Sequence, residues 1–218
     1  MAYGFLEIAR TESVKAAQAA NGVGAYWDNF KGHREFSGFT AAETAFIAAR
    51  DSFYMASVSD TGWPYVQHRG GPAGFLRVID EKTLAFADFR GNRQYISLGN
   101  INANDRVALF LMDYPNRRRL KIYARAEVKD LTADPAFAEK LMTRGYKGKP
   151  ERAFILHLEA FDWNCSQHIT QRFTEAEIDQ ALTPVRARIA QLEAENKMLR
   201  EKFGIVTKEP GKEEQHAS

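Results

Sequence analysis

Residues 53–71, FYMASVSDTGWPYVQHRGG, contain two runs of strand-forming residues around a tight turn. The turn signal is DTG at residues 60–62, and β-branched and aromatic residues flank it on both sides. A second hairpin is predicted between GFLRVI and LAFADF, with DEKT at residues 80–83 as its turn. Successive hairpins favour a small antiparallel barrel over a parallel sheet.

Longer strand patterns and helix signals complete the central part of the chain. The strand patterns are RVALFLMDY, RLKIYARAEV and ERAFILHLEAFDWN. Thr40 and Glu43 have the spacing of a capping box, which marks the start of a short helix. Asp134 and Pro135 are suited to the N-cap and the first position of another. We therefore expect a mainly β (α+β) fold, a six-stranded antiparallel β-barrel with peripheral helices.

The C-terminal segment has a different apolar period. Six residues recur at alternating intervals of four and three: Val185, Ile189, Leu192, Asn196, Leu199 and Phe203. This heptad pattern is typical of a coiled coil, although a helix packed on its own barrel would also carry an apolar stripe. The narrow stripe and the polar Asn196 favour pairing with a partner helix.

The chain thus divides into four predicted segments. We expect an N-terminal helix and wrapping loop at 1–39, the barrel at 40–173, a dimerisation helix at 174–204 and a flexible tail at 205–218. A chain of 218 residues is long enough for one well-buried domain with such an appendage.

Composition excludes several classes of protein. The formal net charge is only +2, so the chain as a whole does not attract nucleic acid or a membrane surface. The basic run at 117–119 could form a local nucleic-acid patch, but nearby acidic residues argue against this. The single Cys165 excludes an internal disulfide framework, and the histidines lack the spacing of metal ligands. No apolar run reaches the roughly 18 residues of a membrane span, and the N-terminus lacks the apolar core of a signal peptide. We expect a cytoplasmic protein.

Two stretches carry candidate binding residues. In QHRGGP at 67–72, adjacent glycines allow close approach of a ligand and an arginine supplies a cation, although a glycine bulge with a surface arginine would look the same. In DFRGNRQ at 88–94 a strand ends and a helix is predicted to begin with Asn92 near its N-cap, which suits a phosphate. The candidates are Gln67, His68, Arg69, Asp88, Arg90, Asn92, Arg93 and Gln94.

The sequences FYMASVSDTGWPYVQHRGG and TLAFADFRGNRQYISLGNINANDRVALFLMDY resemble the core of the pyridoxamine 5'-phosphate oxidase-like FMN-binding split barrels. The resemblance covers roughly residues 40–165. It implies a split barrel, a homodimer with the cofactor site at the subunit interface, and FMN-dependent oxidoreduction of a small molecule. The arginine-bearing C-terminal ending with which the family's authentic oxidases bind substrate is missing, so the identity of the substrate does not carry over.

The resemblance also assigns roles to the candidate residues. Arg69, with Gln67 and His68, matches the strand beside the flavin ring. Asn92 and Arg93 match the turn that grips the phosphate, where Gln94 replaces a common lysine and Arg90 compensates. Trp163, Gln167 and His168, in the segment after the last strand, are further candidates for cofactor contact.

Two other functional classes fit the same residues. One is a non-enzymatic flavin-binding or sensing protein whose C-terminal helix recruits a partner. The other is a split barrel that binds another planar cofactor, such as haem or a deazaflavin.

Overall fold

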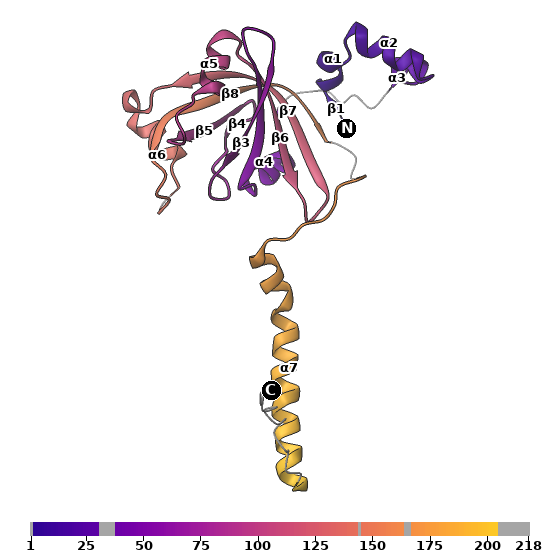
Figure 1. Cartoon of the computed structure of the whole chain (residues 1–218), viewed down its shortest axis with the longest axis vertical. Coiled ribbons are helices and arrows are strands. Elements are labelled where there is room, and N and C mark those ends of the chain that lie inside the picture. Colours follow the sequence, from indigo (N-terminus) through magenta and orange to yellow (C-terminus); the bar gives the residue numbers. More distant parts are fainter. Residues whose placement is uncertain (1, 31–37, 144, 164–166, 205–218) are drawn as a thin grey trace, which may run out of the picture. The chain divides into compact units, whose positions relative to one another are not determined.

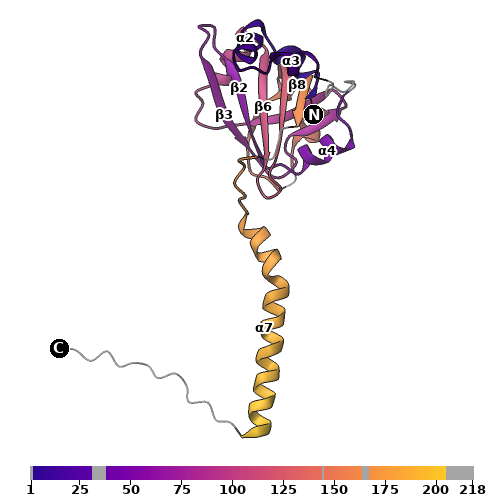
Figure 2. The same cartoon turned by 90° about the vertical axis from the view of Figure 1, so that its right-hand side faces the viewer.

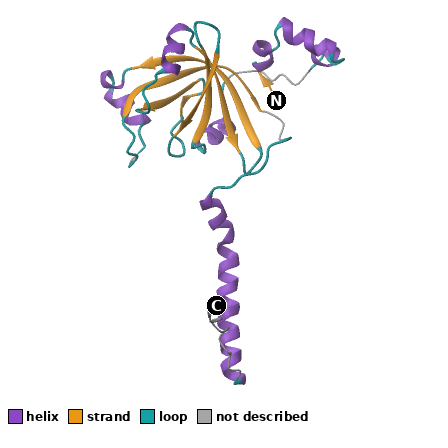
Figure 3. Ribbon diagram, viewed as in Figure 1, coloured by secondary structure: helices purple, strands orange, loops and turns teal. Residues whose placement is uncertain are grey.

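The computed structural model describes residues 2–30, 38–143, 145–163 and 167–204. It contains two compact units, Met1–Gln171 and Arg172–Ser218 (Figures 1 and 3). The first is a β-barrel with peripheral helices and the second is built on one long helix. The expected tail at 205–218, and residues 164–166 of the segment after the last strand, lie outside the described residues.

The barrel is a single antiparallel sheet with the strand order β3-β2-β6-β7-β8-β5-β4. A short strand, β1, pairs with β8 off this path. The strands are β1 (Ala2–Tyr3), β2 (Ser52–Val58), β3 (Pro64–Gly70), β4 (Arg77–Asp80), β5 (Thr83–Phe89), β6 (Arg106–Asp113), β7 (Arg118–Lys129) and β8 (Pro150–Trp163). The predicted fold class is confirmed, whereas the predicted count of six strands is too low. Strand β4 lies in the segment GFLRVI that was predicted as part of a hairpin, and the two-residue strand β1 was not predicted.

The described helices belong to both units: α7 (Glu175–Phe203) is the helix of the second unit, and the others belong to the first. Those of the first unit are α1 (Phe5–Ala9), α2 (Glu12–Ala20), α3 (Gly24–Asp28), α4 (Ala41–Ala48), α5 (Ile96–Ala103), the 3-10 turn η1 (Leu131–Ala133) and α6 (Pro135–Leu141). The capping box predicted for Thr40 and Glu43 forms at the start of α4, and Asp134 caps α6 with Pro135 in its first turn. None of the described helices is long and apolar enough to cross a membrane.

Alternating side chains of the central strands build the core. On β2, Phe53 and Met55 point inward and are at most 1% exposed. Phe86 of β5 stacks on Phe154 of β8 with ring centroids 5.2 Å apart, and Ile122 of β7 is fully buried. Alternation of this kind brings every second residue of a strand to the same face. The core therefore fixes which residues of β3 and β5 can share a site.

Candidate functional site

Strand alternation divides the candidates on β3 between two faces. Gln67 and Arg69 lie on one face, whereas His68 lies on the other, where its ring meets Tyr54 edge to face at 5.6 Å. A Cβ added to Gly71 would lie 2.7 Å from Cγ of Phe75. The glycine is therefore needed so that the chain can pack against its own core.

A buried ion cluster holds Arg69 in place. Its Nη1 atom donates to Oδ1 of Asp88 at 2.6 Å, and Nη1 of Arg152 lies 3.5 Å from the other carboxylate oxygen. The guanidinium of Arg69 also stands 5.2 Å from the ring centroid of Phe154. Two cations thus share one carboxylate.

Burial dominates the electrostatics of this cluster. It raises the pKa of Asp88 above its usual range, although Arg69 and Arg152 act in the opposite direction. Burial likewise lowers the pKa of Arg69, with Asp88 opposing the shift. Nε of Arg69 and Nη1 of Arg152 are buried without a hydrogen-bond acceptor among the described residues. A cluster with spare donors and perturbed pKa values is typical of a functional site.

The turn between β5 and α5 is strained. Arg93 and Tyr95 both have left-handed backbone conformations, with φ of 64° and 53°. Such conformations cost free energy in residues other than glycine and are concentrated at ligand sites.

Asn92 was predicted to lie near the N-cap of the helix, but α5 begins only at Ile96. The Oδ1 atom of Asn92 instead accepts a hydrogen bond from the backbone N–H of Gln94 at 3.1 Å. The N-cap residue Tyr95 makes no side-chain capping bond, so the first N–H groups of α5 are available to another acceptor.

Glu151 links the turn to β8. The hydroxyl of Tyr95 donates to Oε1 of Glu151 at 3.2 Å, and Nε of Arg93 donates to the same hydroxyl at 3.4 Å. Nε of Arg90 lies 3.5 Å from Glu151, and the guanidinium of Arg152 stands 4.8 Å from the centroid of the Tyr95 ring. Within this part of the site, arginines outnumber carboxylates, so the surroundings favour an anion.

These elements enclose a pocket of about 210 Å³. On one wall, Oγ of Ser97 donates to Oε1 of Gln67 at 2.7 Å, which ties α5 to β3. The lining residues are Gln67, Arg69, Asp88, Phe89, Gly91, Asn92, Arg93, Tyr95, Ser97, Leu98, Glu151 and Phe154. The pocket therefore joins the two stretches that the sequence singled out.

Five of the candidate residues meet in this pocket: Gln67, Arg69, Asp88, Asn92 and Arg93. Arg90 and Gln94 belong to the same turn but do not line it. The other three candidates lie elsewhere. Trp163, the last residue of β8, donates from Nε1 to Oε1 of Glu43 at 2.6 Å, and Gln167 and His168 are exposed. Contact of these outlying residues with a cofactor remains a prediction.

Sequence reasoning missed the contribution of α5, of its N-cap residue and of β8, namely Tyr95, Ser97, Glu151, Arg152 and Phe154. Arg152 pairs directly with Asp88 in the register of β8 with β5. The two residues are far apart in the chain, and no sequence pattern near either of them predicts the contact. The charge pair ER at the start of a strand pattern was the only available hint.

A sequence model of the family described as Pyridoxamine 5'-phosphate oxidase matches residues 39–158. No curated protein matches the chain.

Several solved structures are similar over the barrel. A protein of Clostridium acetobutylicum related to general stress protein 26 of B. subtilis, of the pyridoxinephosphate oxidase family, is 16% identical, with 63% of this chain and 94% of that chain covered and a TM-score of 0.44. An FMN-binding protein from Syntrophomonas wolfei is 14% identical, with 57% and 84% covered and a TM-score of 0.44. An F420 reductase is 25% identical, with 53% and 93% covered and a TM-score of 0.38. At these scores the assignment depends on the family match, which spans more than half of the sequence. The chain belongs to the pyridoxamine 5'-phosphate oxidase family.

Proposed function

We propose that the protein binds FMN in this pocket and acts as an FMN-dependent oxidoreductase on a small molecule. The observation that carries the proposal is the convergence of Arg69, Asn92 and Arg93 on one pocket, with an uncapped helix start beside them. When bound, FMN would supply hydride or single-electron transfer, and the protein would supply orientation and charge.

The turn before α5 would hold the phosphate. Arg93 offers a guanidinium at the pocket, and the first N–H groups of α5 have no side-chain acceptor. Charge-assisted hydrogen bonds from arginine and N–H groups at a helix start are a common way to bind phosphate. The left-handed backbone of Arg93 and Tyr95 fixes this turn before the ligand arrives.

Arg69 would stand beside the flavin ring. Asp88 and the Phe154 ring fix its guanidinium, so little side-chain entropy would be lost on binding. A fixed cation near the ring stabilises the negative charge of the reduced flavin. Gln67, tied to Ser97, would add a polar contact on the same wall.

The size of the pocket favours a site completed by a second copy of the chain. Its volume of about 210 Å³ is below the roughly 300–1,000 Å³ of typical ligand pockets, so one chain provides only part of an enclosure. Strands β3, β2 and β6 lie side by side (Figure 2). Tyr54 and Val66 on these strands are exposed and line a mainly apolar groove of about 350 Å³. This exposed apolar face is the surface that we propose the homodimer buries.

Absorption spectroscopy of the purified protein tests the choice of cofactor. The proposal expects the bands of oxidised flavin and release of FMN on denaturation. Haem or deazaflavin bands, or an apoprotein that does not bind added FMN, would overturn it. Consumption of reduced nicotinamide by the loaded protein, above the rate with free FMN, distinguishes an oxidoreductase from a protein that only binds or senses flavin.

A further inference from the structure

Helix α7 carries an apolar seam that its own unit leaves open. The helix spans 29 residues, none of them buried. The seam, in heptad order, consists of Ile178, Leu182, Val185, Ile189, Leu192, Asn196, Leu199 and Phe203. The structure thus extends the predicted pattern by two residues toward the N-terminus, because the helix already begins at Glu175.

The ends of α7 are strongly specified. Thr174 and Glu177 form a capping box at the start, and Gly204 closes the end with a left-handed φ of 62°. Pro184 lies within the helix but outside the seam. An isolated helix draws little stability from propensity alone and normally needs an apolar face to pack against another element. A well-capped helix with an exposed seam therefore requires an occupant for that face.

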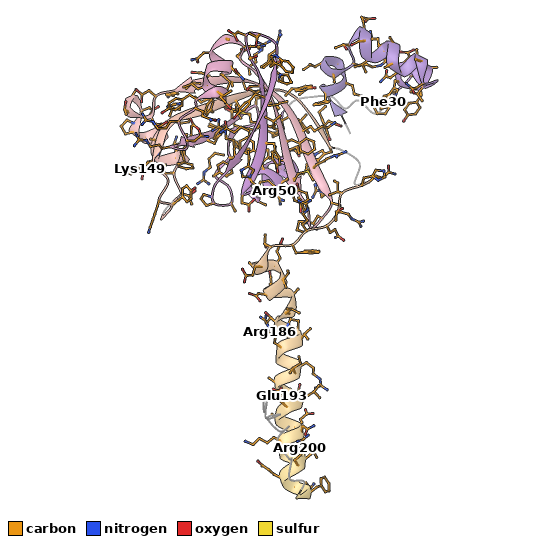
Figure 4. All side chains as sticks on the ribbon, in the orientation of Figure 1. Phe30, Arg50, Lys149, Arg186, Glu193 and Arg200 are labelled. Atoms are coloured by element: carbon orange, nitrogen blue, oxygen red, sulfur yellow. The ribbon has the colours of Figure 1, made fainter. Side chains whose placement is uncertain are left out.

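We propose that α7 pairs in parallel with α7 of a second copy of this chain, as a two-stranded coiled coil. Leu182, Ile189, Asn196 and Phe203 take position a, and Ile178, Val185, Leu192 and Leu199 take position d. In a parallel pair, a residue at g faces the residue at e five positions later in the partner. Arg188 then faces Glu193, and Glu195 faces Arg200, so both contacts are attractive in each direction. Figure 4 labels Glu193 and Arg200 on the helix of one chain.

Asn196 selects the parallel arrangement. An antiparallel pair of the same length would also have attractive contacts, with Glu193 facing Arg186. It would, however, place Asn196 opposite Val185 and bury an amide against an apolar side chain. In the parallel pair Asn196 meets its counterpart, which fixes register and a two-stranded state. In a parallel pair the N-termini of both helices lie at the same end of the coiled coil. In each chain, that N-terminus follows the barrel in the sequence.

Disulfide trapping in the full-length chain tests this pairing. Asn196→Cys is introduced in a Cys165→Ser background and oxidised. Paired a positions bring the two Cα atoms near the roughly 4.4–6.8 Å that a disulfide requires. Ala194→Cys, on the outer side of the helix at position f, is the matched control. We expect a covalent dimer with Asn196→Cys and with Leu199→Cys, and little or none with Ala194→Cys.

The alternatives give different band patterns. Trapping only between Val185→Cys and Asn196→Cys chains would show an antiparallel pair and overturn the proposal. Absence of a covalent dimer at both Asn196→Cys and Leu199→Cys, as expected for a helix packed on its own barrel or on another protein, would also overturn it. Adding Leu192→Asp should abolish the trapped dimer, whereas adding Gln191→Asp should not. Flavin absorption reports on the barrel alone, so failure of the pairing and failure of FMN binding are distinguishable.

Discussion

Apolar side chains are buried in the barrel but exposed along α7. In the barrel, Leu120 and Ile122 are fully buried by strands of the same chain. In α7, Leu192 is 45% exposed and Leu199 is 54% exposed, although both belong to a regular apolar pattern. Hairpins return the chain to its own sheet and complete a core within one copy, whereas none of the residues of the single helix α7 is buried. The same residue type therefore has different energetic consequences in the two units.

The same substitution in both units should expose this difference most strongly. Leu120→Ala removes a fully buried side chain, and it should lower the free energy of unfolding of the barrel by about 2–5 kcal/mol. Leu192→Ala should leave the barrel's unfolding within about 0.5 kcal/mol of wild type. Denaturant unfolding followed by barrel fluorescence provides the comparison. Equal losses in the two variants would contradict the separation of the units.

Within the barrel, the binding turn should affect affinity with little effect on folding. Arg93→Ala should weaken FMN binding by about ten- to a hundredfold, since a charge-assisted hydrogen bond contributes about 1.5–3 kcal/mol. Arg117→Ala removes another exposed arginine with a left-handed φ, in the turn between β6 and β7, and should leave the dissociation constant unchanged. Titration of the apoprotein with FMN measures both. Equal affinity in wild type and Arg93→Ala would remove the phosphate assignment.

Glu43 is a buried carboxylate whose contribution to the stability of the fold should depend on pH. Burial acts to raise the pKa of Glu43, but hydrogen bonds from Thr40 and Trp163 outweigh it and hold the pKa below its usual value of 4.5. A depressed pKa stabilises the folded state above the unfolded value, and this contribution is lost as pH falls through the folded value. Glu43→Gln should therefore lower stability by about 1–2 kcal/mol at neutral pH and by less in acid.

Thermal unfolding from pH 7 to pH 3 measures this dependence. Glu81→Gln, at an exposed glutamate in the turn between β4 and β5, is the control and should follow the wild-type profile. An acid profile of Glu43→Gln parallel to that of wild type would show that the contact with Trp163 does not depend on charge.

Local signals explain how much of this molecule could be predicted from its sequence. The hairpin turns and the capping box of Thr40 involve residues close together in the chain, and all of them formed. The heptad pattern of α7 is also local. The contact of Arg152 with Asp88 was not predictable, because it depends on the pairing of β8 with β5. The strained turn at Arg93 and Tyr95 was missed for another reason, since neither is a residue type that favours a positive φ.

Charge reversal at Glu193 should have the smallest effect of these variants, and it distinguishes a parallel from an antiparallel pair of α7 helices. Glu193→Arg replaces an attractive contact with a repulsive one and should weaken the helix pair by a few tenths of a kcal/mol up to about 1 kcal/mol, as is usual for exposed ion pairs. In a parallel pair, residue 193 faces Arg188 of the second helix, so adding Arg188→Glu should restore the dimer. In an antiparallel pair, residue 193 faces Arg186, and only Arg186→Glu would restore the dimer. Sedimentation of the single and double variants at low ionic strength measures the dimer constants, because salt screens such contacts. Recovery by Arg188→Glu and not by Arg186→Glu is the outcome that a parallel coiled coil requires.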